Sequence, residues 1–193
     1  MTLKLMLERE ASRHREKTAI VSGDSRLSYA DLDKASNKVA NALIRMGVNG
    51  GDRIAMLLSN SPEFVITFFG IVKAGAIAVP LDPQYRLDEL TALFNDCLPV
   101  GLVTESPVLE PLIPFLSRFK SIKHVIDLSS KCDGQFLSYQ EIIEAGSPRR
   151  IDVEPEPDDI ALILYTSGPS FLPRGVMLSH RGLVEETAIM GDG

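Results

Sequence analysis

The chain has 193 residues, of which 45% are hydrophobic and 24% are charged, as is typical of a globular protein with a buried core. It carries 20 lysines and arginines against 26 aspartates and glutamates, so its net charge is −6. This balance argues against a general nucleic-acid binder and against a polybasic membrane anchor, while local recognition of a nucleotide stays open.

Neither the cysteines nor the first residues indicate a secreted protein. Cys97 and Cys132 form no C-x-x-C motif and no metal-ligand pattern. Two buried thiols in a cytoplasmic protein are therefore favoured over a disulfide. The apolar run Thr2–Leu7 is too short for a signal peptide, and charge from Glu8 onward interrupts it.

The predicted elements begin with a hairpin and a helix. Ala19–Val21 and Arg26–Leu27 flank the turn-forming Ser-Gly-Asp-Ser and predict two paired strands. Ser28 has the position of an N-cap, with Asp31 at the capping-box spacing. The helix that follows places apolar side chains on one face until Gly47 stops it.

The apolar segment Phe64–Leu81 is about as long as a membrane-spanning helix. However, Lys73 lies inside it, and Gly75 and Pro80 break it. We therefore predict a buried helix, capped by Ser61 and running to Ala74, followed by a buried strand.

Strands and helices alternate along the rest of the chain. The further predicted strands are 53–58, 76–79, 101–104, 124–128 and 160–165, and the further predicted helices lie around 87–94, 107–119 and 139–145. Pro111 and Pro114 interrupt the second of these helices. The alternation predicts an α/β fold with a mostly parallel sheet flanked by helices on both faces.

One segment has the composition of a linker. Residues 147–159 are rich in proline and acidic side chains. We expect this segment to separate a first α/β subdomain, residues 1–155, from the start of a second, residues 156–193.

The stretch Ile163-Leu-Tyr-Thr-Ser-Gly-Pro-Ser-Phe-Leu-Pro-Arg-Gly-Val-Met-Leu178 joins two apolar runs by a segment rich in hydroxyls. Small residues let backbone N–H groups approach phosphate oxygens, and a cation offsets their charge. The stretch predicts a phosphate-binding loop, although it lacks the G-x-x-x-x-G-K-[ST] pattern of a Walker A loop.

This stretch resembles the phosphate-binding signature of the acyl-adenylate-forming enzymes, Tyr-Thr-Ser-Gly-Thr-Thr-Gly-x-Pro-Lys-Gly-Val. Several other segments, in the same order, resemble the N-terminal region of fatty-acyl-CoA ligases. They are Leu27-Ser-Tyr-Ala-Asp-Leu-Asp, Gly51-Asp-Arg-Ile-Ala, Asn60-Ser-Pro-Glu-Phe, Gly70-Ile-Val-Lys-Ala-Gly-Ala and Pro157-Asp-Asp-Ile-Ala. Luciferases and the adenylation domains of peptide synthetases share much of this pattern.

The resemblance implies a reaction in two steps. A carboxylate attacks the α-phosphate of ATP to give an acyl-adenylate and pyrophosphate, and the thiol of coenzyme A then displaces AMP. Mg²⁺ neutralises the phosphates. The substrate implied is a small-molecule carboxylate such as a fatty acid. By position, the phosphate-binding residues are Thr166, Ser167, Gly168, Pro169, Ser170, Phe171 and Arg174.

Three departures from the family pattern change the chemistry of the loop. Arg174 replaces lysine, which keeps the charge but changes a point donor into a planar fork. Pro169 replaces threonine or serine and removes a hydroxyl and an N–H donor. Phe171 replaces glycine, which costs about 1–2 kcal/mol if the backbone is left-handed there.

The resemblance also covers only the first part of such enzymes, since the family's later motifs and its C-terminal lysine have no match here. We therefore expect the chain alone not to complete adenylation. The missing C-terminal region or a second copy would cover an exposed sheet. The alternative is a truncated, non-catalytic module that binds a nucleotide or another protein, and a flavodoxin-like domain is disfavoured because no glycine-rich turn follows the first strand.

Other polar residues have simpler explanations than catalysis. His180 follows the second apolar run near a helix start, and packing or capping is favoured over a general base because no acid or nucleophile is paired with it. His14 and His124 lack partners at metal-ligand spacing. Asp158 and Asp159 are adjacent, which favours a role in a turn over a metal pair.

Overall fold

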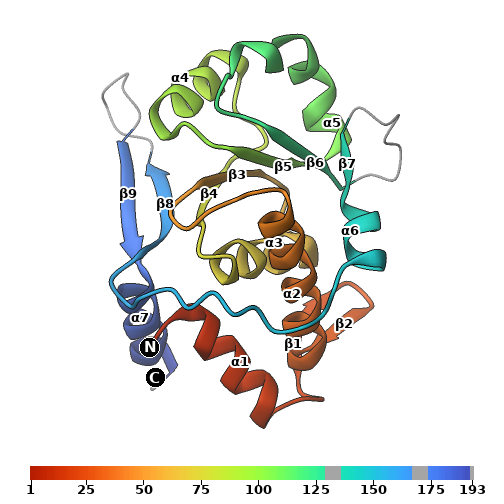
Figure 1. Cartoon of the computed structure of the whole chain (residues 1–193), viewed down its shortest axis with the longest axis vertical. Coiled ribbons are helices and arrows are strands. Elements are labelled where there is room, and N and C mark those ends of the chain that lie inside the picture. Colours follow the sequence, from red (N-terminus) through yellow and green to blue (C-terminus); the bar gives the residue numbers. More distant parts are fainter. Residues whose placement is uncertain (129–135, 167–173, 192–193) are drawn as a thin grey trace.

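The computed structural model describes residues 1–128, 136–166 and 174–191. Its centre is a seven-stranded sheet in the order β7-β6-β5-β3-β4-β8-β9 (Figure 1). All its neighbouring strands are parallel except β8 and β9, which are antiparallel. The strands are β3 (Arg53–Leu57), β4 (Ile77–Leu81), β5 (Gly101–Thr104), β6 (His124–Asp127), β7 (Leu137–Ser138), β8 (Ile160–Thr166) and β9 (Arg174–Ser179).

Helices cover both faces of this sheet, as the alternation predicts. One face packs against α2 (Tyr29–Arg45), α3 (Pro62–Lys73) and α6 (Tyr139–Ala145). The other packs against α4 (Leu87–Cys97) and the 3-10 helix η1 (Glu110–Arg118). Side chains alternate between the faces: Ile54 and Met56 of β3 belong to the first core, and Ala55 and Leu57 to the second. The predicted fold class is confirmed.

Two helix starts follow the predicted capping chemistry. The Ser28 hydroxyl oxygen accepts from the Asp31 N–H at 3.2 Å and begins α2. The Ser61 hydroxyl oxygen accepts from the Phe64 N–H at 3.2 Å and begins α3, with Pro62 in the first turn. Gly47 has φ +84° just after α2, as a stop residue in the left-handed conformation requires.

The chain differs from the sequence-based expectation in its first residues and around the prolines. Helix α1 (Leu3–Arg13) was not predicted, although Leu3, Leu7 and Ala11 form its buried face. Residues 107–119, predicted as a helix, form a short helix α5 (Ser106–Leu109) and then η1. Pro111 and Pro114 lack the N–H groups that a regular α-helix would need.

The apolar segment Phe64–Leu81 forms helix α3 and strand β4, as predicted. No helix in the described part of the chain is long and apolar enough to cross a membrane. The predicted hairpin is also present, as β1 (Thr18–Ser22) paired with β2 (Ser25–Ser28) in a separate two-stranded sheet.

The predicted linker, residues 147–159, runs across the molecule from α6 to β8 beside α1 and α2 (Figure 1). The Asn41 side-chain amide donates to the carbonyl oxygens of Ser147 and Arg149 at 3.0 Å each. The Ile151 side chain is buried in the first core. The segment is thus fixed to the helices, while the division into residues 1–155 and 156–193 stays a prediction.

Candidate functional site

The strands β8 and β9 bring two of the predicted phosphate-binding residues together. Thr166 ends β8 and Arg174 begins β9, and the two are direct partners in the antiparallel register. Both are exposed. The other predicted residues, Ser167, Gly168, Pro169, Ser170 and Phe171, lie outside the described residues, so their contribution stays a prediction.

A cavity of about 540 Å³ lies at the carboxyl edge of the sheet, where β8 ends. Ligands of open α/β sheets bind at this edge, outside the carboxyl ends of the parallel strands. The residues lining the cavity end β4, follow β3 and β4, or belong to β8 and α3: Leu58, Ser59, Asn60, Phe64, Pro80, Leu81, Asp82, Pro83, Gln84, Tyr85 and Tyr165. The loop predicted to bind phosphate therefore starts one residue after the cavity wall.

The turns at this edge are held by their own side chains. The Ser59 hydroxyl donates to the Glu105 carboxylate at 2.6 Å, which ties the end of β3 to the end of β5. An Asp82 carboxylate oxygen accepts from the Gln84 N–H at 2.8 Å and shapes the turn after β4. Asp82 and Tyr85 were not among the predicted site residues, although polar turn residues directly after a strand are a usable signal.

Tyr165 separates this cavity from a second one of about 420 Å³, which is lined on its other side by Arg53, Asp96 and Cys97. The Tyr165 hydroxyl donates to the Asp96 carboxylate. Burial, together with this bond, raises the pKa of Tyr165 far above its ordinary value. Tyr165 is therefore a neutral, fixed wall of the site and not a proton-transfer group at physiological pH.

Cys97, one of the two cysteines predicted to be buried thiols, is free and buried beside this second cavity. Burial raises its pKa to about 11. The thiol is therefore protonated and unreactive at neutral pH. Cys132 lies outside the described residues.

The remaining polar residues have the structural roles that the sequence favours. His180 begins α7 (His180–Gly191) and is buried. Asp159 accepts from the Glu156 N–H at 2.8 Å in the turn before β8, and Asp158 pairs with Arg181. In the described part of the chain, neither aspartate belongs to a group of three or more His, Cys, Asp or Glu side chains that could hold a metal ion.

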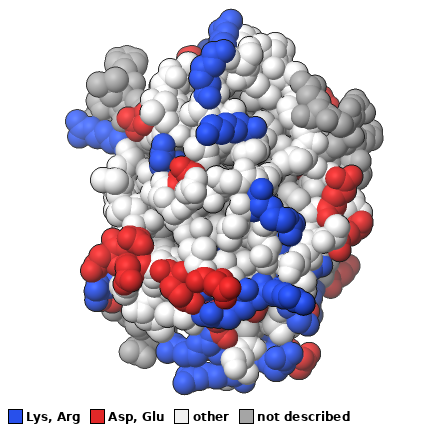
Figure 2. All heavy atoms as spheres, in the orientation of Figure 1, with Lys and Arg blue, Asp and Glu red and all other residues white. Residues whose placement is uncertain are grey.

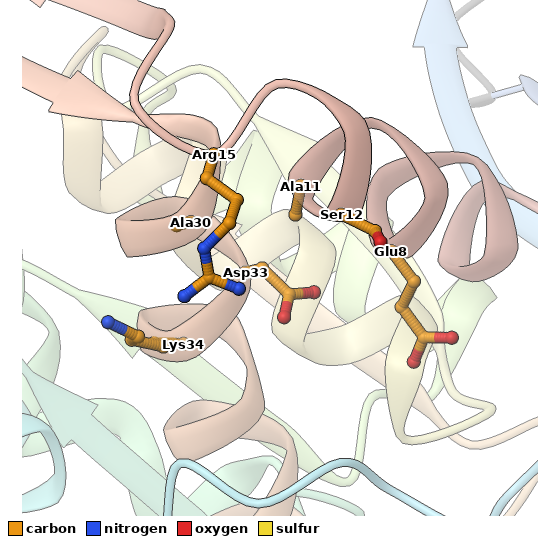
Figure 3. Close-up of a pocket in the computed structure, with 7 residues that line it drawn as sticks. All are labelled: Glu8, Ala11, Ser12, Arg15, Ala30, Asp33 and Lys34. Atoms are coloured by element: carbon orange, nitrogen blue, oxygen red, sulfur yellow. The ribbon is translucent and has the colours of Figure 1, made fainter.

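A third pocket, of about 180 Å³, lies between α1 and α2 (Figure 3). Arg15, Asp33 and Lys34 approach it from one side and Glu8 from the other. It lies away from the carboxyl edge of the sheet, and its acidic side chains already pair with cations. On the face shown in Figure 2, basic and acidic side chains are mixed and form no continuous basic surface.

Comparison with known proteins identifies the family. The family model described as AMP-binding enzyme matches residues 7–192. A 4-coumarate–CoA ligase of Humulus lupulus is 30% identical over 184 residues, which are 94% of this chain and 34% of the ligase. A medium/long-chain-fatty-acid–CoA/3-oxocholest-4-en-26-oate–CoA ligase of Mycobacterium marinum is 32% identical over 177 residues, 87% of this chain and 32% of the ligase. Tyrocidine synthase 3 of Brevibacillus parabrevis is 32% identical over 183 residues, 95% of this chain and 3% of the synthase.

Solved structures agree with this result. The anthranilate CoA ligase AuaEII, solved with anthranoyl-AMP, superposes with a TM-score of 0.89 at 26% identity, over 94% of this chain and 35% of the ligase. ATP-bound MatB of Rhodopseudomonas palustris superposes with a TM-score of 0.84 at 26% identity, over 100% of this chain and 38% of MatB.

The chain thus spans about a third of the length of the two CoA ligases, 34% and 32%. The family match and the superposition on solved ligases agree with one another. The resemblance to the acyl-adenylate-forming enzymes is confirmed, and the chain belongs to the AMP-binding enzyme family.

Proposed function

We propose that this chain is the part of an AMP-forming carboxylate–CoA ligase that binds the β- and γ-phosphates of ATP, and that the carboxylate is a fatty acid. The observation that carries the proposal is the pairing of Thr166 with Arg174 at the carboxyl edge of the sheet, beside the cavity of about 540 Å³. A hydroxyl and a guanidinium facing each other across a hairpin suit phosphate oxygens as ligands. The relative from Mycobacterium marinum supports fatty acids as the substrate class.

The described residues support ATP as a cofactor better than they support Mg²⁺ or coenzyme A. Exposed Thr166 and Arg174 suit a nucleotide phosphate, and the ATP-bound relative supports ATP. Mg²⁺ would neutralise the ATP phosphates, but the described residues include no group of three or more His, Cys, Asp or Glu side chains to hold it. Coenzyme A as acceptor and a cytoplasmic location stay predictions from the resemblance.

Because the matched region is about a third of each CoA ligase, we propose that it does not complete adenylation alone. The 193-residue chain should then show no carboxylate-dependent exchange of pyrophosphate into ATP. Pyrophosphate exchange above background that depends on an added fatty acid would contradict this part of the proposal.

Replacing the hairpin cation should weaken ATP binding. We expect Arg174→Gln to raise the Kd for ATP by about tenfold or more, because a charge-assisted bond to phosphate contributes about 1.5–3 kcal/mol. Equilibrium dialysis with radiolabelled ATP measures this change.

Arg26→Gln on the β1–β2 hairpin is the matched control, since Arg26 is also an exposed hairpin arginine. Its Kd should equal that of the parent. Equal affinity of the Arg174→Gln variant and the parent would remove Arg174 from the phosphate site.

A second candidate function is a non-catalytic interaction module. The observation in its favour is that Leu164, Val176 and Met177 are 38%, 46% and 66% exposed on β8 and β9. Exposed apolar side chains at a sheet edge favour contact with another protein surface, either the rest of a ligase or a second copy of this chain.

The parent chain should therefore self-associate in light scattering. Val176→Lys should reduce this association, whereas Val21→Lys on the β1–β2 hairpin should not. A strictly monomeric parent that binds no ATP would contradict both candidate functions.

A further inference from the structure

The end of the β8–β9 hairpin opposite Thr166 and Arg174 is closed by a set of hydrogen bonds. The His180 N–H donates to the Asp159 carbonyl oxygen at 3.0 Å, and the Arg181 N–H donates to the Pro157 carbonyl oxygen at 2.7 Å. The Arg181 guanidinium also donates to both carboxylate oxygens of Asp158, at 2.7 and 3.0 Å. The chain entering β8 and the chain leaving β9 are therefore joined.

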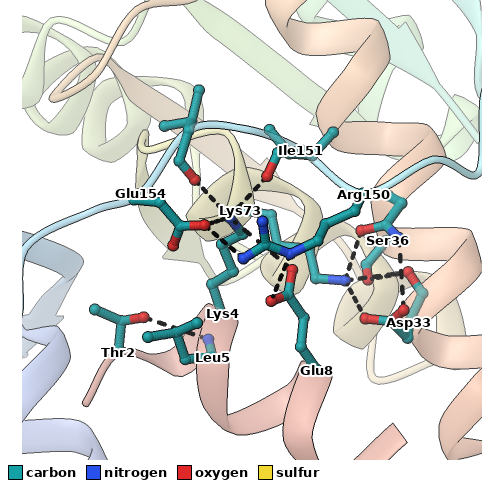
Figure 4. Close-up of polar contacts among 12 residues, drawn as sticks. Thr2, Lys4, Leu5, Glu8, Asp33, Ser36, Lys73, Arg150, Ile151 and Glu154 are labelled. Carbon is teal, nitrogen blue, oxygen red and sulfur yellow. Dashed lines mark hydrogen bonds and ion pairs between the residues drawn. The ribbon is translucent and has the colours of Figure 1, made fainter. Parts of the chain in front are cut away.

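Lys4, in the first turn of α1, holds the segment that leads into β8. Its side chain is 0% exposed, and its ammonium donates to the carbonyl oxygens of Ile151 and Val153 at 2.8 and 2.6 Å. The third donor goes to the Glu154 carboxylate at 2.8 Å. Figure 4 shows the Ile151 and Glu154 contacts above the first turn of α1, with Arg150 lying between Glu154 and Glu8. All three protons of the ammonium are thus used on one short segment.

The neighbouring residue of α1 contacts the chain leaving β9. The Leu3 N–H donates to Nδ1 of His180 at 3.4 Å, and the imidazole is 1% exposed. The Leu3 side chain is in one buried cluster with Ala161 of β8 and Val184 of α7. The first turn of α1 therefore meets both the entry to β8 and the exit from β9.

This contact adds to the packing of β8 along β4, because the hydrogen-bonded register between these two strands is short. β8 pairs with β4 in register at a single position, Ala78 with Leu162. By contrast, β3 and β4 pair along their whole lengths. Contacts at the base of the hairpin therefore act together with the buried side chains of β8 in fixing its position.

We propose that the first turn of α1 is a clamp on the base of the β8–β9 hairpin, and that Lys4 and His180 are positioning residues for Thr166 and Arg174. The clamp concerns the same site as the proposed function, and its effect on ATP binding rests on that function. Neither residue touches the phosphate site. Each acts through the strand that carries a phosphate-binding residue.

The His180 ring must be neutral to accept the Leu3 N–H at Nδ1. Burial lowers the pKa of His180 from its ordinary value of 6.5, and Asp159 opposes this shift. The other nearby charges are the Arg181–Asp158 pair, the Lys4–Glu154 pair and the N-terminal ammonium, which acts on Asp158. In the window between the lowered pKa and 6.5 the unfolded chain binds more protons at this site, so the clamp weakens as the pH falls through that window.

Hydrogen exchange measured by mass spectrometry on the nucleotide-free 193-residue chain tests the clamp. In Lys4→Met we expect residues 160–166 and 174–179 to exchange about tenfold faster, because three acceptors of the entry segment lose their donor. The central strands 53–57 and 101–104 should change by less than about twofold. Lys34→Met, which changes an exposed lysine of α2, is the matched control and should match the parent.

A milder variant keeps the test valid if Lys4→Met does not fold. Glu154→Gln removes the charge of one acceptor and leaves both carbonyl contacts. It should therefore accelerate hydrogen exchange in the same two strands, but by a smaller factor. Unchanged exchange in the hairpin would overturn the clamp. Equal acceleration in every strand would also overturn it, because Lys4 would then serve general stability only.

The pH profile separates positioning by His180 from simple packing. After correction for intrinsic exchange, hairpin exchange in the parent should rise as the pH falls below 6.5. His180→Gln supplies an uncharged acceptor and should give a flat profile, whereas His14→Gln, at an exposed position after α1, should keep the parental one. If His180→Gln kept the pH dependence of hairpin exchange seen in the parent, the positioning role of the His180 imidazole would be overturned.

The link to ATP is tested separately. If the parent binds ATP, Lys4→Met should bind it about tenfold more weakly, in step with its faster hairpin exchange. Full affinity in that variant would overturn the positioning role. A parent that binds no ATP would overturn the proposed function, yet the exchange results on the clamp itself would still hold.

Discussion

Asp33→Ala is expected to lower the free energy of unfolding by about 3–5 kcal/mol, because it leaves a buried ammonium without its counter-ion. Lys73 is 0% exposed, and its Nζ lies 2.6 Å from Oδ1 of Asp33. The ammonium also donates to the Asn37 side-chain oxygen at 2.8 Å (Asp33 and Lys73 are labelled in Figure 4). Burial lowers the pKa of Lys73, and Asp33 acts against this shift. Without the Asp33 carboxylate, the buried ammonium therefore loses its main electrostatic stabilisation.

The reverse change should be milder. Lys73→Met leaves Asp33, which is 23% exposed and can still reach water, and it fills the same space with an apolar side chain. We expect a loss of less than about 2 kcal/mol. Urea denaturation of both variants measures the two values. A loss for Lys73→Met that equals or exceeds the loss for Asp33→Ala would contradict this account of the pair.

Gly70→Ala should destabilise the protein by about 1–3 kcal/mol, although alanine is normally the better helix former. Gly70 lies in α3 where this helix packs against α2. A Cβ there would lie 2.6 Å from both Cβ and Cγ1 of Val39 and 3.2 Å from the Ser36 carbonyl oxygen. Because Val39 Cβ is fixed to the backbone of α2, the two helices would have to move apart.

Gly50→Ala is the control for this prediction. The nearest atom to a Cβ at Gly50 is the Gly75 carbonyl oxygen at 3.8 Å, an ordinary contact. Its effect should stay within about 0.5 kcal/mol. Thermal or urea unfolding compares the two variants. Gly70→Ala as stable as the parent would show that the helix packing is looser than the distances indicate.

The sequence predicts most of the fold because its local signals agree with one another. Ser28 and Ser61 mark helix starts that the hydrogen bonds confirm, and Gly47 marks a helix end. The apolar runs predict the buried strands. Helix α1 has such local signals too, in the N-cap Thr2 and the spacing of Leu3, Leu7 and Ala11, but it was not predicted. The burial of Lys4 within it could not be predicted locally, because it depends on acceptors at Ile151 and Glu154, far away in the sequence.

The site is predictable only in part, for a related reason. Thr166 and Arg174 stand out because hydroxyls and a cation follow an apolar run directly, and the structure pairs them. The cavity wall formed by Asp82 and Tyr85 depends on β4 lying next to β8, and these strands are far apart in the chain. Strand order of this kind is a tertiary property that local patterns do not contain.

The most direct test of the central claim is to locate bound ATP on the chain. A photoreactive ATP analogue with its reactive group on the γ-phosphate would be cross-linked to the 193-residue protein, and the labelled peptides would be mapped by mass spectrometry. We expect labelling within residues 160–179, abolished by excess ATP and strongly reduced in Arg174→Gln. Labelling confined to another region, such as the pocket between α1 and α2, would contradict it.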